Sequence, residues 1–195
     1  MEADWEIEVG GATPIIDALW TGFIDLRRQP ERVGEIAEAA SFPALSRLLL
    51  CLNGVRSPLW TSKCDLWEPD AAELAIGGAV ADGPRAGLAC YIDMLPHEGM
   101  VFAHWQQAEA FCREWVTKLA MKSPAQGSTS LGALPENRVD LIVREAIAGE
   151  AEEFGITAYI GATGQDKTAA TEALAIALAD FADAIPTDAP PAKEA

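Results

Sequence analysis

Positive charge is scarce in this 195-residue chain, which has 14 lysine and arginine residues against 30 aspartate and glutamate residues and a net charge of −16. A field of that sign repels the phosphate backbone of nucleic acids and the anionic headgroups of membranes. We therefore expect neither nucleic-acid binding nor binding to a membrane surface. The same charge favours solubility and would attract a basic protein, a basic peptide or a cation.

Long hydrophobic runs are also missing, because the longest ones, such as residues 48–52, are far too short to cross a bilayer. Residues 1–5 are acidic where a secretion signal would be basic. The four cysteines show no Cys-x-x-Cys spacing, and we interpret them as reduced, mostly buried thiols. These features predict a cytoplasmic protein.

Half of the residues are hydrophobic and 23% are charged, as in an ordinary globular protein. We expect residues 1–185 to form a single globular α+β domain. Residues 122–137, rich in serine, glycine and proline, are predicted to be a flexible loop within it. Residues 186–195 are predicted to be a disordered tail.

The hydrophobic pattern predicts three successive strand-strand-helix units. Hairpins joined by helices favour a mainly antiparallel sheet with the helices packed on one face, which is the α+β class. The clearest helix spans residues 100–121. Its predicted buried face is a stripe at helical spacing that consists of Val101, Trp105, Ala108, Cys112, Trp115 and Leu119. Strands are expected at 5–9, 15–26, 59–67, 86–95, 139–147 and 154–162, and the other helices near 30, at 43–52 and at 168–185.

A tetrapeptide with one aspartate between two apolar residues recurs at 23–26, 63–66, 91–94 and 138–141. Successive side chains on a strand point to opposite faces of the sheet, so each aspartate lies on one face and its two neighbours in sequence lie on the other. Aspartate is rare in strands, so its repeated placement predicts a sheet with an apolar side and a charged, open side.

The open side of this sheet is the candidate site, because it collects aromatic, cationic and anionic groups. Such a surface could bind a basic protein or peptide, or a small ligand, with Trp67 and Tyr91 as anchors. The alternative is a solvated sheet face whose opposite charges pair across strands. Large aromatic residues on that face favour a contact surface. The candidate residues are Asp25, Lys63, Asp65, Trp67, Tyr91, Asp93, Asp140, Arg144 and Tyr159.

An enzyme with a carboxylate or Cys/His site near Asp93 and His97 is the competing hypothesis. Cys64 or Cys90 paired with His97 would need hydrogen-bond contact to form a reactive thiolate. Alternatively, both cysteines face the core as small hydrophobic residues.

No cofactor is expected. Residues 161–168 follow a strand and open a helix as a phosphate-binding loop does, but Asp166 occupies the position where that loop needs glycine. A carboxylate there opposes the charge of a phosphate, so Asp166 is predicted to cap the helix instead. No cation-binding loop pattern occurs in the sequence.

Overall fold

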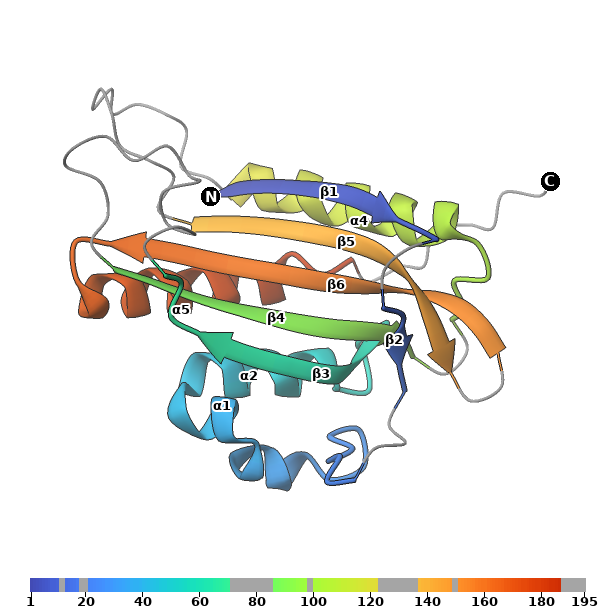
Figure 1. Ribbon diagram of the computed structural model, residues 1–195, viewed down its shortest axis with the longest axis horizontal. Helices are drawn as coiled ribbons and strands as arrows, with labels where there is room; N and C mark the ends of the chain where they lie inside the picture. Colours follow the sequence, from blue (N-terminus) through green and yellow to red (C-terminus); the bar gives the residue numbers. More distant parts are fainter. Residues whose placement is uncertain are drawn as a thin grey trace.

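The computed structural model describes residues 1–10, 13–17, 21–70, 86–97, 100–122, 137–148 and 151–186. Most of the predicted loop at 122–137 and of the predicted tail at 186–195 lies outside these ranges. The described chain is an α+β protein with a mixed sheet backed by helices (Figure 1). Its elements are β1 (Glu2–Glu8), β2 (Ile15–Ile16), the 3-10 helix η1 (Pro30–Glu35), α1 (Ala37–Ser41), α2 (Pro43–Leu52), β3 (Leu59–Trp67), β4 (Ala86–Pro96), α4 (Trp105–Lys122), β5 (Asn137–Ala148), β6 (Ala151–Gly164) and α5 (Lys167–Asp183).

The strands are ordered β1, β5, β6, β4, β3, and β2 also pairs with β5. The pairs β3–β4, β4–β6 and β5–β6 are antiparallel, whereas β1 and β2 run parallel to β5. Two strand-strand-helix units are present, β3–β4–α4 and β5–β6–α5. The expected first unit is wrong, because β1 and β2 both join β5 instead of forming a hairpin with each other.

The strand predicted at 15–26 is largely wrong. Its described part is strand only at Ile15–Ile16, and the chain forms turns from residue 21 onward. The Asp25 carboxylate accepts hydrogen bonds from the backbone N–H and the guanidinium of Arg27 at 2.8–3.0 Å. Side chains that bond the nearby backbone favour turns over strand ladders. Asp25 therefore does not belong to the sheet face on which it was expected.

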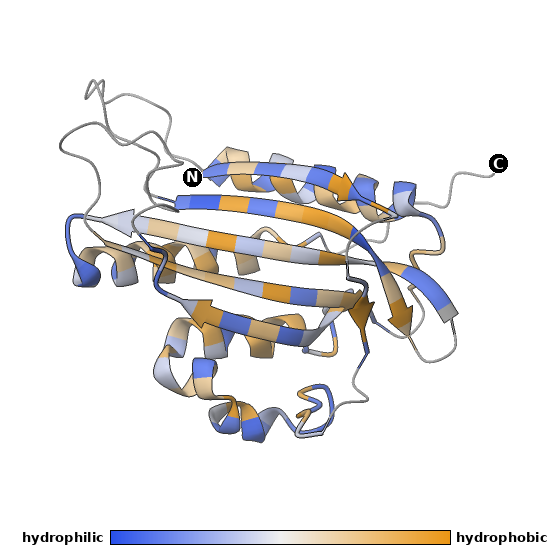
Figure 2. Ribbon diagram, in the orientation of Figure 1, coloured by the Kyte–Doolittle hydropathy of each residue, from blue (hydrophilic) through white to orange (hydrophobic). Residues whose placement is uncertain are grey.

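The main core lies between the sheet and its helices. α4 packs on β1 and β5, α5 packs on β6 and β4, and α2 packs on α5 and β3. Hydrophilic and hydrophobic residues alternate along parts of β3 and β5 (Figure 2), whereas residues 141–143 of β5 form a continuous apolar stretch. Most of the apolar members face the helices, and Ile92, Leu141 and Val143 are fully buried there.

Aromatic residues join α4 to α5 at the centre of this core. The Trp115 ring stacks on Phe181 with 4.2 Å between ring centroids. Its indole N–H donates a hydrogen bond to the Phe181 carbonyl at 3.2 Å. The predicted burial of Ala108, Cys112, Trp115 and Leu119 is confirmed, whereas Trp105 is only partly buried.

The N-terminal limit predicted for this helix is wrong, because α4 begins at Trp105 and not at Met100. The preceding segment runs beside β6, where the Phe102 carbonyl accepts a hydrogen bond from the Phe154 N–H at 2.9 Å. Phe102 is consequently buried, while Val101 is half exposed.

A second, smaller apolar cluster lies at one end of the opposite sheet face. It consists of Ile15, Trp60, Leu95 and Ala146, with Phe23 packed against it. Gly155 permits this approach, since a Cβ there would lie 2.7 Å from the Met94 carbonyl and 2.9 Å from the Ile15 side chain. This face is therefore covered at one end, where β2 lies in Figure 1.

Replacing Trp115 by alanine should lower the free energy of unfolding by about 3–5 kcal/mol, the usual cost of deleting a buried aromatic ring. Urea denaturation followed by circular dichroism measures the change. Ile176→Ala on α5 is the control, because Ile176 is 59% exposed and should alter stability by no more than about 0.5 kcal/mol. Equal midpoints for the two variants would contradict the packing of α4 on α5.

Candidate functional site

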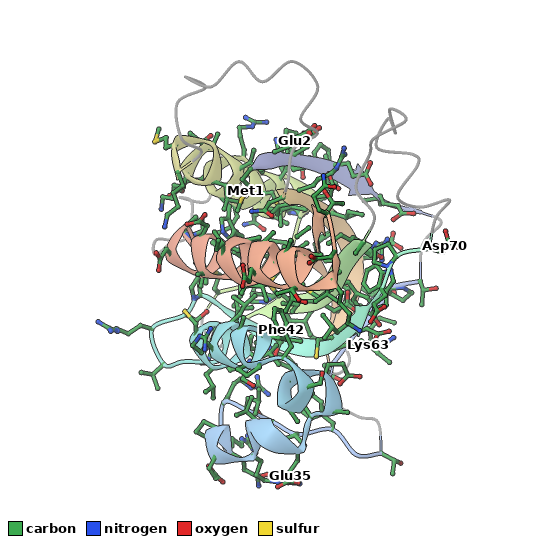
Figure 3. All side chains as sticks on the ribbon, turned by 90° about the vertical axis from the view of Figure 1, so that its left-hand side faces the viewer. Met1, Glu2, Glu35, Phe42, Lys63 and Asp70 are labelled. Carbon is green, nitrogen blue, oxygen red and sulfur yellow. The ribbon has the colours of Figure 1, made fainter. Side chains whose placement is uncertain are left out.

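The side of the sheet away from α2, α4 and α5 carries the candidate site, and we call it the open face. Figure 3 shows the molecule end-on, with Lys63 on the side of the sheet away from α5. Residues paired across neighbouring strands point to the same side, so the pairing defines rows across the sheet. Two central rows are Asp4, Asp140, Tyr159, Tyr91, Asp65 and Glu6, Ile142, Thr157, Asp93, Lys63.

Three aromatic rings form a continuous series on this face, which we call the aromatic ladder: Trp67 on β3, Tyr91 on β4 and Tyr159 on β6. Ring centroids are 6.3 Å apart between Trp67 and Tyr91, and 5.9 Å apart between Tyr91 and Tyr159. These spacings are typical of favourable aromatic pairs. All three rings are half-buried, so each keeps part of its surface available for contact.

Cationic side chains lie against the rings of the ladder. The Lys63 ammonium is 5.3 Å from the centre of the Tyr91 ring, and the Arg144 guanidinium is 5.9 Å from that of Tyr159. The neighbouring Tyr91 hydroxyl raises the pKa of Lys63, so this side chain stays protonated at neutral pH. Burial is the main cause of a raised pKa at Tyr91. The ladder thus already accommodates positive charge at its margins.

Asp93 lies in the row next to the ladder and is largely buried. Its Oδ1 atom accepts a hydrogen bond from the Thr157 hydroxyl at 2.6 Å. Burial raises the pKa of the Asp93 carboxyl, while the Thr157 hydrogen bond and the charges of Lys63 and Arg144 oppose that rise. The net direction is upward because removing a carboxylate from water disfavours its ionised form.

Carboxylates dominate the β1 edge of the open face. Arg138 donates hydrogen bonds to Asp140 at 2.7 and 2.9 Å, and its guanidinium lies 3.8 Å from Glu2. Arg144 forms an ion pair with Glu8 at 2.8 Å. Between β1 and the ladder lies a hollow of about 240 Å³, lined by Asp4, Trp5, Glu6, Arg138, Asp140, Ile142 and Tyr159.

Most of the predicted site residues come together on this face. The exception is Asp25, which lies in the turn described above. The β1 carboxylates were missed, although the alternation of acidic residues along residues 2–8 was a visible signal. Their position could not be derived, because the pairing of β1 with β5 joins distant parts of the chain. The residues brought together are Lys63, Asp65, Trp67, Tyr91, Asp93, Asp140, Arg144 and Tyr159.

The geometry gives little support to a Cys/His pair. Cys90 is buried with the core on the helix side, and Cys64 packs against that core. Burial raises the pKa of Cys64 to about 12 and raises that of Cys90 as well, which disfavours the thiolate that catalysis needs. His97 lies beyond the end of β4, and within the described ranges no hydrogen bond joins its side chain to Cys64, Cys90 or Asp93.

The Asp166 carboxylate caps α5 by accepting from the Ala169 N–H at 2.9 Å, as predicted. No group of three or more histidine, cysteine, aspartate or glutamate side chains in the described part of the chain is placed to hold a metal ion. None of the described helices is long and apolar enough to cross a bilayer. Comparisons with family models, curated proteins and solved structures found no match to this chain.

Asp93→Asn should raise the thermal unfolding temperature at neutral pH. The folded-state pKa of Asp93 is above its ordinary value of 3.8, so stability is complete below that pH and decreases as pH rises through the folded pKa. Asparagine still accepts from Thr157 but carries no charge, so the gain over the native protein should grow with pH and vanish below about pH 4.

Differential scanning calorimetry across this pH range measures the effect. Asp140→Asn is the matched control, since it loses an ion pair with Arg138 and should gain no stability. An Asp93→Asn protein less stable than the native one at pH 7 would show that Lys63 and Arg144 outweigh the burial of the charge.

Proposed function

We propose that the protein is a non-catalytic binding module whose open face binds an extended, basic peptide segment of a partner protein. The observation that carries this proposal is the aromatic ladder, a run of three half-buried rings across three strands of an otherwise charged surface. Aromatic residues of this kind supply much of the affinity at protein interfaces.

Charge favours a basic occupant. The row that contains Tyr91 and Tyr159 ends in Asp65 on one side and in Asp140 and Asp4 on the other. Lysine and arginine side chains can place their apolar stems on the rings and their charges beside these carboxylates. The net charge of −16 would accelerate the encounter with such a partner.

The width of the sheet sets the length of the segment. The row crosses five strands, and strands are about 4.8 Å apart, so its span is about 19 Å. An extended peptide advances about 3.3 Å per residue, so six residues cover the row. Eight residues would reach both acidic ends with some overhang.

The competing enzyme hypothesis draws on a different feature, the raised pKa of Asp93 in a largely buried position. His97, the other residue of that hypothesis, lies beyond the end of β4, and no hydrogen bond in the described ranges joins it to the Asp93 carboxylate. We therefore favour the binding function.

The four free cysteines support our expectation of a reducing, cytoplasmic environment.

A peptide of alternating arginine and threonine, eight residues long, tests the proposal against a peptide of alternating glutamate and threonine. The basic peptide should bind and shift the NMR signals of the ladder residues, and the acidic one should not. Trp67→Ala and Tyr159→Ala should each weaken binding about tenfold or more, equivalent to about 1.4 kcal/mol. Raising the salt concentration should slow association more than it speeds dissociation.

Charge controls make this test specific. Asp65→Asn should reduce affinity, whereas Asp183→Asn removes the same charge from the helix side and should not. Circular dichroism confirms that each variant is folded. Equal binding of both peptides, or unchanged affinity in both aromatic variants, would contradict the proposal.

A further inference from the structure

A cavity of about 410 Å³ opens beside the sheet at the outer edge of β3. Its floor is residues 61–65 of β3, and its walls are residues 22–26 and the ends of η1 and α1. Figure 3 labels Lys63 and Glu35, which line it from the sheet and from η1 respectively. Trp67 and Tyr159 of the aromatic ladder do not line it.

The cavity has apolar walls and an acidic rim. Phe23, Ile24, Leu26, Ile36 and Leu49 supply the apolar surface. Glu35, Glu38 and Asp65 supply carboxylates, and Lys63 is the cation among the described lining residues. The charges of Glu35 and Lys63 are already engaged, by Arg32 at 2.7 Å and by the Tyr91 ring.

Glu38 is the carboxylate available to a ligand. Within the described ranges no hydrogen bond or ion pair engages its carboxylate, and its side chain is half-buried at the cavity. Its negative charge acts on the neighbouring Cys64, where it contributes to the raised pKa of the thiol. A half-buried carboxylate gains most from a cation that arrives with its own apolar body.

Ser62 provides an independent indication of a ligand. It lies where the register of β3 against β4 shifts between Thr61 and Lys63, and it is only 3% exposed. Its Oγ atom has no hydrogen-bond partner among the described residues, although it belongs to a residue that lines the cavity. A buried hydroxyl without a partner costs free energy, so such groups are uncommon and point to a missing partner.

We infer that this cavity binds an alkylammonium group, with the hydrocarbon chain between Ile24 and Leu49 and the ammonium hydrogen-bonded to Glu38 and, after the buried Ser62 hydroxyl turns toward the cavity, to Ser62. An ammonium supplies three N–H donors and a positive charge, which match a carboxylate and a hydroxyl acceptor. Two sources have this chemistry: a free aliphatic amine and the lysine side chain of a peptide.

Three six-carbon probes test the charge requirement: hexylamine, hexanol and hexanoate, each titrated by protein-observed NMR. Hexylamine should bind saturably and shift the signals of residues 61–65 and 36–38. Hexanol should bind at least tenfold more weakly, and hexanoate should not bind. Absence of saturation with hexylamine, or equal affinity for hexanol, would overturn the inference.

The source of the amine is distinguished by a fourth probe, Nα-acetyl-lysine amide. Tighter binding than hexylamine would assign the cavity to a lysine side chain of a polypeptide. Weaker binding would assign it to a free amine. Both results support alkylammonium binding, provided that the site variants weaken whichever probe binds more tightly.

Glu38→Gln preserves shape and removes the charge, so the affinity for hexylamine should fall about tenfold or more. Glu31→Gln, on the exposed side of η1, is the matched control and should have no effect. Ser62→Ala should weaken hexylamine binding several-fold while leaving the unfolding temperature of the free protein unchanged or higher, since no hydrogen bond is lost. Unchanged affinity in Glu38→Gln would overturn the inference.

This site is independent of the proposed function, and the variants separate the two. Trp67→Ala and Tyr159→Ala should retain hexylamine binding, and Glu38→Gln and Ser62→Ala should retain binding of the basic peptide. A variant that loses peptide binding and keeps hexylamine binding is therefore altered at the open face alone. Lys63, Asp65 and Tyr91 border both sites, so the four variants that separate the two sites leave them unchanged.

Discussion

The structure depends on the strict alternation of side chains along β4, β5 and β6, which divides every strand between two environments. Ile92, Leu141 and Ile160 face the helices and are excluded from water, and their burial is a main source of stability. Residues next to them in sequence must then point to the other side. Asp93 shows the consequence, because the register that buries Ile92 also holds a carboxyl group in a position where ionisation is unfavourable.

Arg27 links this sheet to the segment that borders it. Its guanidinium bonds the Asp25 carboxylate on one side and lies 3.8 Å from the centre of the Trp60 ring on another. The contact holds the turn at residues 25–29 against β3 and closes the small apolar cluster around Trp60 and Leu95. It also positions one wall of the edge cavity, so the covered end of the open face and the cavity share one support.

The sequence predicted those features that follow from short-range periodicity. The alternation of apolar and polar residues was sufficient to predict that Ile92 and Leu141 are buried and that Tyr91 and Tyr159 share one face. On a strand, the direction of each side chain follows from its position relative to its immediate neighbours. The buried stripe of α4 was likewise predicted from helical spacing. The cap at Asp166 could be found because its interaction spans only three residues.

The remaining features depend on contacts between distant residues. The shift at Ser62 accompanies the bonding of Asn53 to Thr61, in which the Asn53 amide donates to the Thr61 hydroxyl and accepts from its N–H. Asn53 was recognisable only as the end of a helix. The early end of β2 could have been suspected from Asp25 and Arg27, whose spacing permits a local turn, but apolar residues around them gave a stronger strand signal. The edge cavity lies between these two features, the register shift at Ser62 and the turn segment before η1.

The pairing of β1 with β5 has a consequence for the time course of folding. The ion pair between Glu8 and Arg144 joins residues 136 positions apart, and the whole of β1 pairs at a similar separation. Because β1 is parallel to β5, it has no hairpin turn to guide it, and its docking requires closure of a loop that contains most of the chain. The antiparallel β5–β6 hairpin, by contrast, can form as soon as its own residues are available. The first strand in the sequence therefore completes the sheet after the hairpin that receives it, and such long-range contacts place this chain among the slower-folding topologies.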